Sequence, residues 1–313
     1  METRGNIVLT GAAGLVGQNL VPRLKAASPQ RVVCIDKHKS NAGTLARLHP
    51  DVRVIEADLA KRGGWEEAFA NIDTLILNHA QISALDESPF IENNVIATKN
   101  VLGAAKKCGV RQIVHVSSSV VNSKASDFYV QTKKTQEELV LESGIPACIL
   151  RPTLMFGWFD RKHLGWLARF MQRTPLFPIP GDGRYLRQPL YAGDFCNIII
   201  SCIENPRLGR SYNISGLETI DYIELICAVK AATKASAKLV HIPYPAFWLL
   251  LRLYAFFDRN PPFTTNQLEA LVIPEVFEII DWPTIFGVRP TPLPEALRQT
   301  FQDPNYSNIS LEF

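Results

Sequence analysis

The feature that most constrains the fold of this chain is a glycine-rich turn close to its N-terminus. Residues 10–17 read TGAAGLVG, after an apolar run over 6–10 and before helical spacing of apolar residues over 15–27. Glycines at this spacing let a strand turn tightly into a helix and leave the helix N-terminus open, where backbone N–H groups bind phosphate. The spacing is GxxGxxG rather than GxGxxG, so it indicates a dinucleotide site only in a strand–turn–helix unit, which this segment predicts.

Each glycine of the turn has its own predicted role. Gly11 permits the tight turn, Gly14 lets the backbone approach a pyrophosphate, and Gly17 lets the helix pack closely on the sheet. Leu15 and Val16 lie between these glycines and are assigned to the same cofactor site.

Strands and helices are predicted to alternate over the first half of the chain. Apolar runs predict strands over 6–10, 31–36, 52–57, 74–78, 112–117 and 147–151, and helical spacing predicts helices over 15–27, 65–70, 89–108 and 129–143. This alternation predicts an α/β fold with a doubly wound parallel sheet of the Rossmann type.

The rhythm changes after Pro152. A helix is predicted over 194–203, a strand over 211–214, and helix again from 220, with prolines crowded between them. We therefore expect a dinucleotide-binding Rossmann domain and a smaller C-terminal substrate-binding lobe. The expected bounds are 1–152 for the Rossmann domain, with about 188–215 returning to it, and 153–187 with 216–313 for the lobe.

Composition narrows the class of protein. Apolar residues make up 47% and charged residues 20% of the chain, as in ordinary globular proteins. The formal net charge of +3 gives no electrostatic reason to expect a nucleic-acid partner. The six cysteines are scattered without a CxxC pair, so we expect free thiols in a reducing cytosol and no metal site. No signal peptide precedes the first strand, and a cytoplasmic protein is expected.

A long apolar stretch lies in the predicted lobe. Residues 244–257 read YPAFWLLLRLYAFF, with Arg252 the one charge. The stretch is shorter than the ~20 residues that cross a bilayer, so no transmembrane segment is expected. Two interpretations stay open: a buried helix of the lobe, or a peripheral apolar surface at Phe247–Phe257.

An acidic residue ends the second predicted strand. Asp36 follows the glycine turn by ~20 residues, the position from which a carboxylate binds the hydroxyls of the adenosine ribose. A 2′-phosphate would be repelled there, so Asp36 favours NAD. Lys37, His38 and Lys39 follow at once; they keep NADP open as an alternative, although solvated loop charge is the commoner role of such residues.

A tyrosine and a lysine share one face of a predicted helix. Tyr129 and Lys133 are four residues apart, and the serine run Ser117–Ser119 ends the preceding strand. A nearby ammonium, together with a positive nicotinamide ring, would lower the pKa of Tyr129 and make it a usable general acid/base. A serine hydroxyl at the strand end can hydrogen-bond the substrate oxygen whose proton the tyrosine handles.

In this order the motifs resemble those of the extended and atypical short-chain dehydrogenase/reductases, in the NAD-dependent epimerase/dehydratase family. TGAAGLVG is similar to TGxxGxxG of that family, and similar segments follow in its order: Asp58-Leu59, Asn78-His79-Ala80, Glu92–Val95, Val116–Ser119, YVQTK over 129–133, Arg151–Gly157, Gly181–Gly183 and Leu190–Asp194. The resemblance runs through most of the chain. It implies NAD, a small-molecule substrate, and a homodimer built on the helices over 89–108 and 129–143.

The resemblance also assigns roles to single residues. It implies Ser119, Tyr129 and Lys133 as the catalytic set. The residues that it implies at the cofactor are Gly11, Gly14, Leu15, Val16, Gly17, Asp36, Asp58, Leu59, Asn78, Ala80, Tyr129, Lys133 and Pro152. Those that it implies at the substrate are Gln81, Asn94, Ser118, Ser119 and Arg187, of which Asn94 and Arg187 match positions that touch the sugar or its diphosphate.

Three departures from the family pattern bear on the substrate. Leu154 stands where the family carries a phosphate-binding asparagine, and Arg289-Pro290 is only a partial match to a late RPGD motif. The segment between Ser119 and Tyr129 is short. These departures weaken the case for a nucleoside diphosphate, and with the apolar stretch they make the chain similar to atypical members, some of which act on apolar substrates or have lost catalysis.

We predict an NAD(P)-dependent oxidoreductase or epimerase that acts by hydride transfer on a secondary alcohol or ketone of a nucleotide sugar, with Tyr129 as acid/base. One alternative is a reductase or dehydrogenase of an apolar, steroid- or polyketide-like ketone. An alternative of another class is a non-catalytic cofactor-binding subunit, against which the intact Ser119, Tyr129 and Lys133 argue. Dehydration is the least favoured net reaction, because Val120-Val121 follow Ser119 where a dehydratase would carry an acidic pair.

Asp36 generates a prediction about the choice of cofactor. NAD(H) is expected to bind more tightly than NADP(H), because the carboxylate repels a 2′-phosphate. Calorimetric titration of both cofactors measures the two dissociation constants. Tighter binding of NADP(H) by tenfold, or ~1.4 kcal/mol, would contradict the prediction. It would indicate that Lys37 or Lys39 binds the 2′-phosphate.

Overall fold

Seven parallel strands form the central sheet of this chain, which a computed structural model describes over residues 5–27, 31–124, 127–257 and 264–312. The strands lie in the order β11-β6-β5-β4-β1-β2-β3. Their bounds are β1 Ile7–Thr10, β2 Val32–Asp36, β3 Arg53–Glu56, β4 Thr74–Leu77, β5 Gln112–Val116, β6 Ala147–Pro152 and β11 Arg210–Ile214. The expected doubly wound parallel α/β fold is confirmed.

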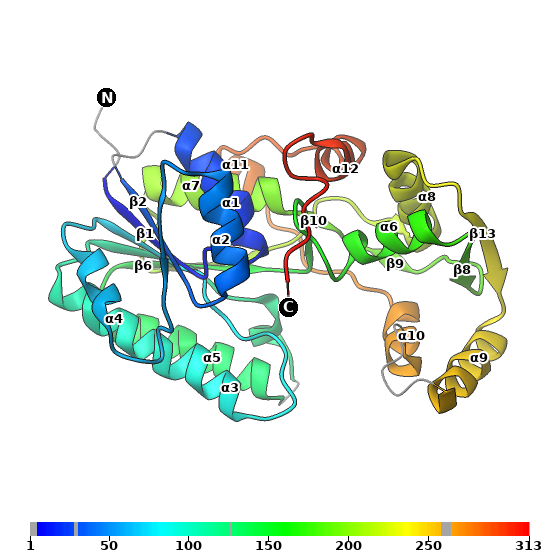
Figure 1. Ribbon diagram of the computed structural model, residues 1–313, viewed down its shortest axis with the longest axis horizontal. Helices are drawn as coiled ribbons and strands as arrows, with labels where there is room; N and C mark the ends of the chain where they lie inside the picture. The colour runs from blue at the N-terminus through cyan, green and yellow to red at the C-terminus, as the bar shows by residue number, and fades with distance from the viewer. Residues whose placement is uncertain (1–4, 28–30, 125–126, 258–263, 313) are drawn as a thin grey trace.

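Helices cover both faces of this sheet (Figure 1). One face carries α1 Leu15–Ala26, α2 Lys39–Leu48, α7 Ala192–Glu204 and α11 Trp282–Phe286. The other face carries the 3-10 turn η1 Gly64–Phe69, α3 Ser88–Phe90, the π-helical turn η2 Ile91–Ile96, α4 Ala97–Lys107 and α5 Phe128–Glu142. Each face has its own apolar core, with Leu20 and Phe195 fully buried in one and Phe69 and Val101 in the other.

The strand order reverses at β1, which has β2 on one side and β4 on the other. Thr10 at the end of β1 lies opposite Ile35 of β2 and Leu77 of β4. The segments that leave β1 and β4 diverge toward opposite faces of the sheet, and the space between them is where open α/β sheets bind ligands. The fold therefore puts the glycine turn at the ligand-binding edge.

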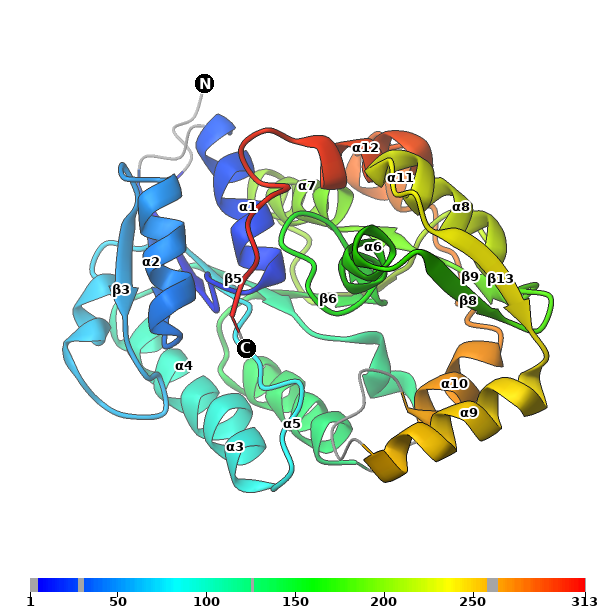
Figure 2. The same ribbon diagram turned by 45° about the vertical axis from the view of Figure 1, so that its right-hand side comes forward.

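The second lobe is built from short strand pairs and helices beyond this edge (Figure 2). Its strands pair as β7 Met155–Phe156 with β10 Leu190–Tyr191, β8 Leu176–Pro180 with β13 Lys238–Ile242, and β9 Leu186–Arg187 with β12 Ile220–Asp221. Its helices are α6 Leu164–Arg173, α8 Tyr222–Thr233, α9 Tyr244–Phe257, α10 Thr265–Val272 and α12 Leu293–Gln302. A third apolar core joins α6, α8 and α12, with Met171 and Ile226 fully buried.

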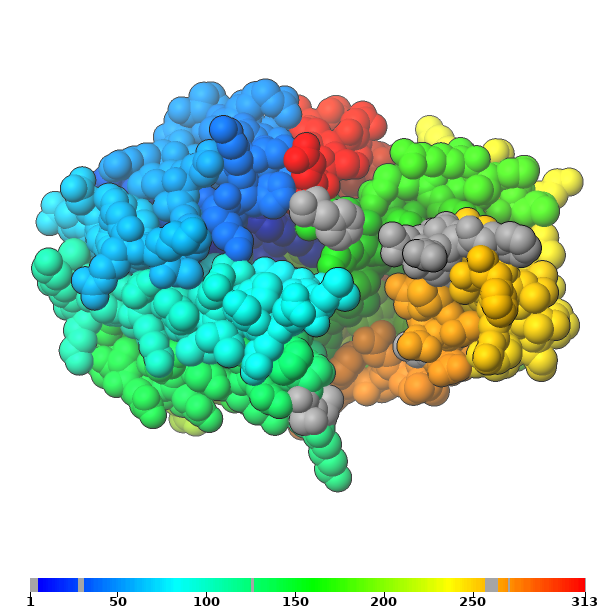
Figure 3. All heavy atoms as spheres, turned by 60° about the horizontal axis from the view of Figure 1, so that its bottom comes forward, coloured from blue at the N-terminus to red at the C-terminus, as the bar shows by residue number. Residues whose placement is uncertain are grey.

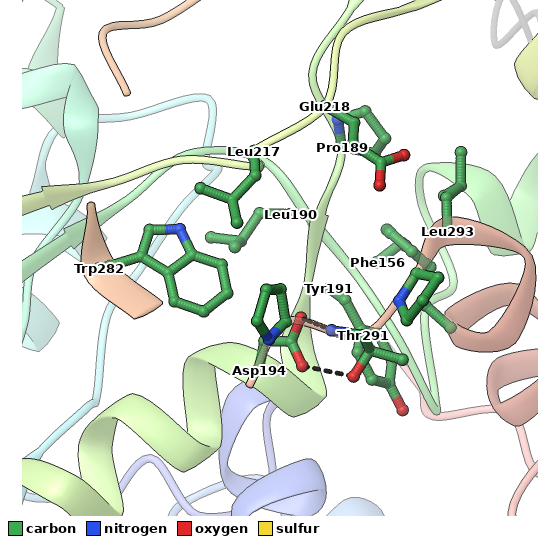
Figure 4. Close-up of a pocket in the computed structure, with 14 residues that line it drawn as sticks. Phe156, Pro189, Leu190, Tyr191, Asp194, Leu217, Glu218, Trp282, Thr291 and Leu293 are labelled. Atoms are coloured by element: carbon green, nitrogen blue, oxygen red, sulfur yellow. Dashed lines mark hydrogen bonds between the residues drawn. The ribbon is translucent and has the colours of Figure 1, made fainter. Parts of the chain in front are cut away.

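The lobe and the sheet are joined by a return of the chain. Strand β11 adds to β6, and α7 packs beside α1. In the first turn of α7, both oxygens of Asp194 accept hydrogen bonds from Thr291, at 3.0 Å from the backbone nitrogen and 2.6 Å from the hydroxyl (Figure 4). The helix predicted over 194–203 begins at Ala192, and the Asp194 carboxylate in its first turn anchors the C-terminal segment.

Three local predictions differ from the structure. Helix α2 was not expected, and it begins at Lys39 because Nδ1 of His38 accepts a hydrogen bond from the Asn41 nitrogen at 3.4 Å. The helix expected over 65–70 is a 3-10 turn. The helix expected over 89–108 is interrupted by the π-helical turn η2, which holds Asn94 buried beneath the site.

The apolar stretch over 244–257 forms α9, and most of its side chains are exposed. This favours the surface interpretation over the buried helix. Within the described ranges, no helix combines the length and apolar character that a bilayer crossing requires.

Close packing at Gly17 generates a prediction about stability. A Cβ atom at Gly17 would lie 2.3 Å from the carbonyl oxygen of Ala12, whereas one at Gly103 in α4 would meet nothing within 4 Å. We expect Gly17→Ala to lower the free energy of unfolding by about 1–3 kcal/mol because helix α1 and the backbone of the glycine turn at Ala12 must move apart. The matched variant Gly103→Ala should raise it by about 0.5–1 kcal/mol. Urea unfolding measures both, and equal values for the two variants would contradict the prediction.

Candidate active site

The glycine turn leaves the N-terminus of α1 open. Gly11 has a φ of +63°, and a Cβ atom there would lie 2.6 Å from the Cα atom of His79. Gly14 is the N-cap of α1 and supplies no side chain to its N–H groups; a Cβ there would meet nothing closer than 3.6 Å. Uncovered N–H groups at a helix N-terminus bind phosphate, so this turn fits the pyrophosphate of a dinucleotide, with Leu15 and Val16 in the first turn.

Asp36 braces the glycine turn from the neighbouring strand. One carboxylate oxygen accepts from the Ala13 nitrogen at 2.8 Å and the other from the His38 nitrogen at 2.9 Å. Lys37 is engaged elsewhere, since its Nζ donates to Oδ1 of Asn93 at 2.7 Å. The carboxylate therefore lies beside the turn, as a group that binds a ribose must.

The end of β4 supports the same turn from the other side. Nδ2 of Asn78 donates to the Gly11 oxygen at 2.9 Å. Ala80, two residues further, is exposed, and Pro152 is buried at the end of β6. Two of these expected cofactor residues thus follow β4 and the third ends β6, with β5 between the two strands.

Asp58 and Leu59 follow β3 on the outer side of the turn. The carboxylate of Asp58 accepts from the Ala60 nitrogen at 3.0 Å and pairs with Lys61 at 3.4 Å. Leu59 is buried in the apolar core beneath. The Asp58 carboxylate is thus held by residues of its own loop, and Leu59 contributes an apolar side chain to the core beneath that loop.

Tyr129 lies in the first turn of α5, which Asp127 caps by accepting from the Val130 nitrogen at 3.0 Å. Burial raises the pKa of Tyr129, the hydroxyl of Ser118 lowers it by a hydrogen bond, and the carboxylate of Asp127 raises it. The lowered pKa expected from Lys133 is therefore not produced by the chain itself. The hydroxyl that faces the tyrosine is that of Ser118, while Ser119 is half-buried in the following 3-10 turn, η3 Ser119–Asn122.

Lys133 lies one helical turn further along α5 and is 1% exposed. Its Nζ donates to the Val116 oxygen at 3.1 Å and to Oε1 of Gln136 at 2.5 Å. Burial lowers the pKa of Lys133 to about 7, and the carboxylate of Glu137 opposes this shift. The lysine is thus a buried donor, one helical turn after the tyrosine.

Glu137 is a member of the site that sequence reasoning missed. Its carboxylate accepts from the Ser117 hydroxyl at 2.5 Å and from Nε and Nη2 of Arg151 at 2.9 and 2.6 Å. The ion pair fixes the ends of β5 and β6 against α5. The available signal was its spacing, one helical turn after Lys133.

The expected substrate residues are held by backbone contacts. Asn94 is fully buried and clamps Gln81, accepting from its nitrogen at 2.6 Å and donating to its oxygen at 3.1 Å. Arg187 is 9% exposed, and its guanidinium donates to the carbonyls of Leu271 and of Ile273, the latter at 2.8 Å. Asn94 therefore supports the backbone of Gln81, and Arg187 ties β9 to the segment after α10.

The molecule is hollowed between the Rossmann half and the lobe (Figure 3). Leu154, which leaves β6 toward this region, is 45% exposed. His79 and His115 are buried. In the described part of the chain the cysteines are free thiols, and no group of three side chains is arranged to hold a metal ion.

A separate cavity of about 200 Å³ lies at the joint of the lobe and α7 (Figure 4). Trp282, Leu217 and Leu190 line one side, and Asp194 is held by Thr291 at another. None of Ser119, Tyr129 and Lys133 lines it. It belongs to the joint between the two halves and not to the catalytic site.

Comparison with known proteins identifies the family. The model of the NAD dependent epimerase/dehydratase family matches residues 7–215. The chain belongs to this family. Membership makes it an NAD-dependent enzyme of the short-chain dehydrogenase/reductase type, and it agrees with the open glycine turn and with the order of the motifs.

Individual relatives in the family are distant. A low-salt glycan biosynthesis protein of Haloferax volcanii is 29% identical over 68% of this chain and 78% of its own length. An N-acetyl-α-D-glucosaminyl-diphospho-ditrans,octacis-undecaprenol 4-epimerase of Escherichia coli is 27% identical over 77% of this chain and 76% of its own. A UDP-glucuronic acid 4-epimerase of Bacillus cereus, solved with NAD, superposes with a TM-score of 0.71 at 21% identity, covering 95% of each chain. That superposition supports the fold.

Proposed function

We propose that this NAD-dependent enzyme oxidises and re-reduces a secondary alcohol of a sugar diphosphate, or reduces the corresponding ketone, with Tyr129 as acid/base. The observation that carries the proposal is the convergence of Tyr129 and the Ser118 hydroxyl on the same sheet edge as the uncapped N-terminus of α1. Relatives that act on UDP- or diphosphate-linked sugars support the sugar class. Epimerisation is the favoured net reaction.

In this mechanism the bound nicotinamide supplies the hydride acceptor. Tyr129 takes the proton of the substrate hydroxyl, and a serine hydroxyl, of Ser118 or Ser119, donates to the same oxygen and orients it. Lys133 offers its remaining N–H to the cofactor ribose, since two of its three donors are used by the described chain. Asn94 keeps Gln81 at the wall of the site.

The proposal predicts a sharp loss on removal of one oxygen atom. Tyr129→Phe keeps the ring but deletes the hydroxyl, so turnover of a nucleotide sugar should fall on the order of 10²–10⁴-fold. The dissociation constant of NAD should barely change. Lys133→Ala should weaken NAD binding and turnover together. Steady-state kinetics and calorimetry measure these effects, with melting temperatures as the control for folding.

If Tyr129 were an ordinary helix-start aromatic, Tyr129→Phe would keep most activity and any loss would follow thermal stability. A Tyr129→Phe enzyme within about threefold of wild type would remove the tyrosine from the mechanism. The family would then describe the fold and the cofactor alone.

A second substrate class is favoured by one observation, the exposed apolar side chains of the lobe. On α9, Leu250, Leu253 and Phe256 are 54%, 50% and 82% exposed, and Ile273 after α10 is 63% exposed. Arg187 is bonded to the Ile273 carbonyl, so this apolar surface continues to a residue implied at the sugar diphosphate. A polyprenyl diphosphate-linked sugar, the substrate class named for the Escherichia coli relative, has both parts.

The two substrate classes predict different behaviour of α9 variants. With a polyprenyl-linked substrate, Leu250→Glu and Leu253→Glu should lower kcat/KM by about tenfold or more, because each removes apolar contact. Turnover of UDP-N-acetylglucosamine should not change, nor should either activity in Leu208→Glu, an exposed leucine outside the lobe surface. Product analysis on both substrates distinguishes the two substrate classes. Equal kcat/KM in the α9 variants and wild type would leave nucleotide sugars as the one supported substrate class.

We propose a homodimer through the helices α4 and α5, the pair that the family resemblance implies. Leu141 on α5 is 62% exposed, as an apolar contact of a symmetric interface requires. Light scattering of the purified chain should give twice the monomer mass. A monomer at micromolar concentration would contradict the proposal.

A further inference from the structure

A chain of buried side-chain hydrogen bonds runs beneath the site from Lys133 to the glycine turn. Nζ of Lys133 contacts Oε1 of Gln136 at 2.5 Å, and Nε2 of Gln136 contacts the Thr98 hydroxyl at 2.8 Å. The Thr98 hydroxyl contacts Nε2 of His79 at 3.1 Å, and Nδ1 of His79 contacts the Thr10 hydroxyl at 2.9 Å. Thr10 is the residue before Gly11. The chain thus links α5, α4, the end of β4 and the end of β1.

All hydrogen bonds of this series run in one direction, with each donor on the Lys133 side and each acceptor on the side of the glycine turn. An ammonium only donates, so Lys133 fixes the amide of Gln136 with its oxygen toward Nζ. Its nitrogen then faces two acceptors, the Thr98 hydroxyl and the His79 carbonyl, the latter at 3.3 Å. The reversed amide would set nitrogen against ammonium and oxygen against carbonyl.

The opposite end gives the same direction. Thr10 donates to the Ile76 carbonyl at 3.4 Å and accepts from the Asn78 nitrogen at 3.1 Å. Its proton is therefore used, so Nδ1 of His79 donates to Thr10 and Nε2 accepts from Thr98. Burial and the charge of Lys133 lower the pKa of His79 to about 3, which keeps the ring neutral with this single proton. Each hydrogen bond from Gln136 to Thr10 thus has one donor and one acceptor.

We propose that Gln136 is the positioning residue of Lys133, and that it fixes the ammonium in register with the glycine turn through Thr98, His79 and Thr10. Gln136 is fully buried and sits one helical turn after the lysine. It touches neither of the expected substrate residues Asn94 and Arg187 in the hydrogen bonds of the described chain. Its role is therefore to hold another residue and not to react.

A neutral amide suits this position because of the charges that surround the ammonium. The titratable groups that face Lys133 are Glu137 on α5, His79 after β4 and His115 on β5, with Arg151 of β6 bound to Glu137. The carboxylate of Glu137 is already occupied by Arg151 and Ser117. Gln136 therefore supplies the nearest acceptor without adding a negative charge.

The test is a titration of Lys133 itself, which needs neither substrate nor turnover. The εCH₂ signals of ¹³C-labelled lysine are followed from pH 5 to 11 by NMR, and Lys133→Met identifies the signal that is lost. Gln136→Leu removes the acceptor and should lower the pKa of Lys133, whereas Gln136→Glu adds a charge and should raise it, each by about one unit or more. Shifts of opposite sign are expected only if the side-chain oxygen contacts the ammonium.

Two further variants separate positioning from packing. Gln112→Leu removes another amide with two side-chain hydrogen bonds, at the opposite end of β5, and should leave the titration of Lys133 unchanged. Thr98→Val removes the hydroxyl behind Gln136 and should shift the pKa in the direction of Gln136→Leu, by less. The NAD dissociation constant should rise by about tenfold in Gln136→Leu, since Lys133 is no longer held.

The proposal is overturned if both Gln136 variants titrate within about 0.3 units of wild type, or shift in the same direction. An unchanged titration of Lys133 in Thr98→Val would mean that the hydrogen-bond series that positions Lys133 stops at Gln136. If Gln136→Leu does not fold, Gln136→Glu and Thr98→Val carry the same test. The outcome is independent of whether Tyr129→Phe loses turnover, so this inference and the proposed function can fail separately.

Discussion

The burial of one ammonium group organises the centre of this molecule. An isolated charge in an apolar interior costs several kcal/mol, so Lys133 is tolerated only where polar atoms surround it. The carbonyl of Val116, the amide of Gln136 and the carboxylate of Glu137 meet this requirement, and each comes with partners of its own. The hydrogen bonds and the ion pair around the ammonium therefore hold the ends of β4, β5 and β6 against α4 and α5. The first turn of α5, which carries Tyr129, is fixed by the same contacts.

The sheet could be predicted from the sequence because its strands are buried on both faces and read as continuous apolar runs. The glycine turn, Asp36 and the Tyr129/Lys133 pair were found because their roles depend on local spacing. Glu137 and Gln136 were missed because their partners lie on other elements, as far away in the chain as His79. Helix α2 is not evident in the sequence because polar and charged residues such as His38 and Lys39 are typical of loops, while the N-cap depends on the position of one ring nitrogen. The π-helical turn depends on the hydrogen bonds of Asn94 with Gln81, and the spacing of apolar residues in the sequence does not predict such bonds.

The two sides of the site have different chemistry. On the cofactor side, polar side chains brace backbone, so that N–H groups of the turn remain for phosphate. On the substrate side, the polar groups of Arg187 and Asn94 are engaged with main chain, and the exposed side chains nearby are leucine and isoleucine. The described side chains on that side are therefore either already hydrogen-bonded to the main chain or apolar. That division explains why the cofactor could be read from the sequence more easily than the substrate.

The return of the chain to the sheet has a consequence for synthesis. Strand β6 is complete at Pro152, but its outer neighbour β11 begins only at Arg210. At ~5–20 residues per second, a ribosome needs roughly 3–12 s to make the intervening segment. During that interval the nascent Rossmann half presents the hydrogen-bonding edge of β6 to its surroundings, and such edges are where chains aggregate. The order of the strands thus sets a window in which this edge of the unfinished chain has no partner strand.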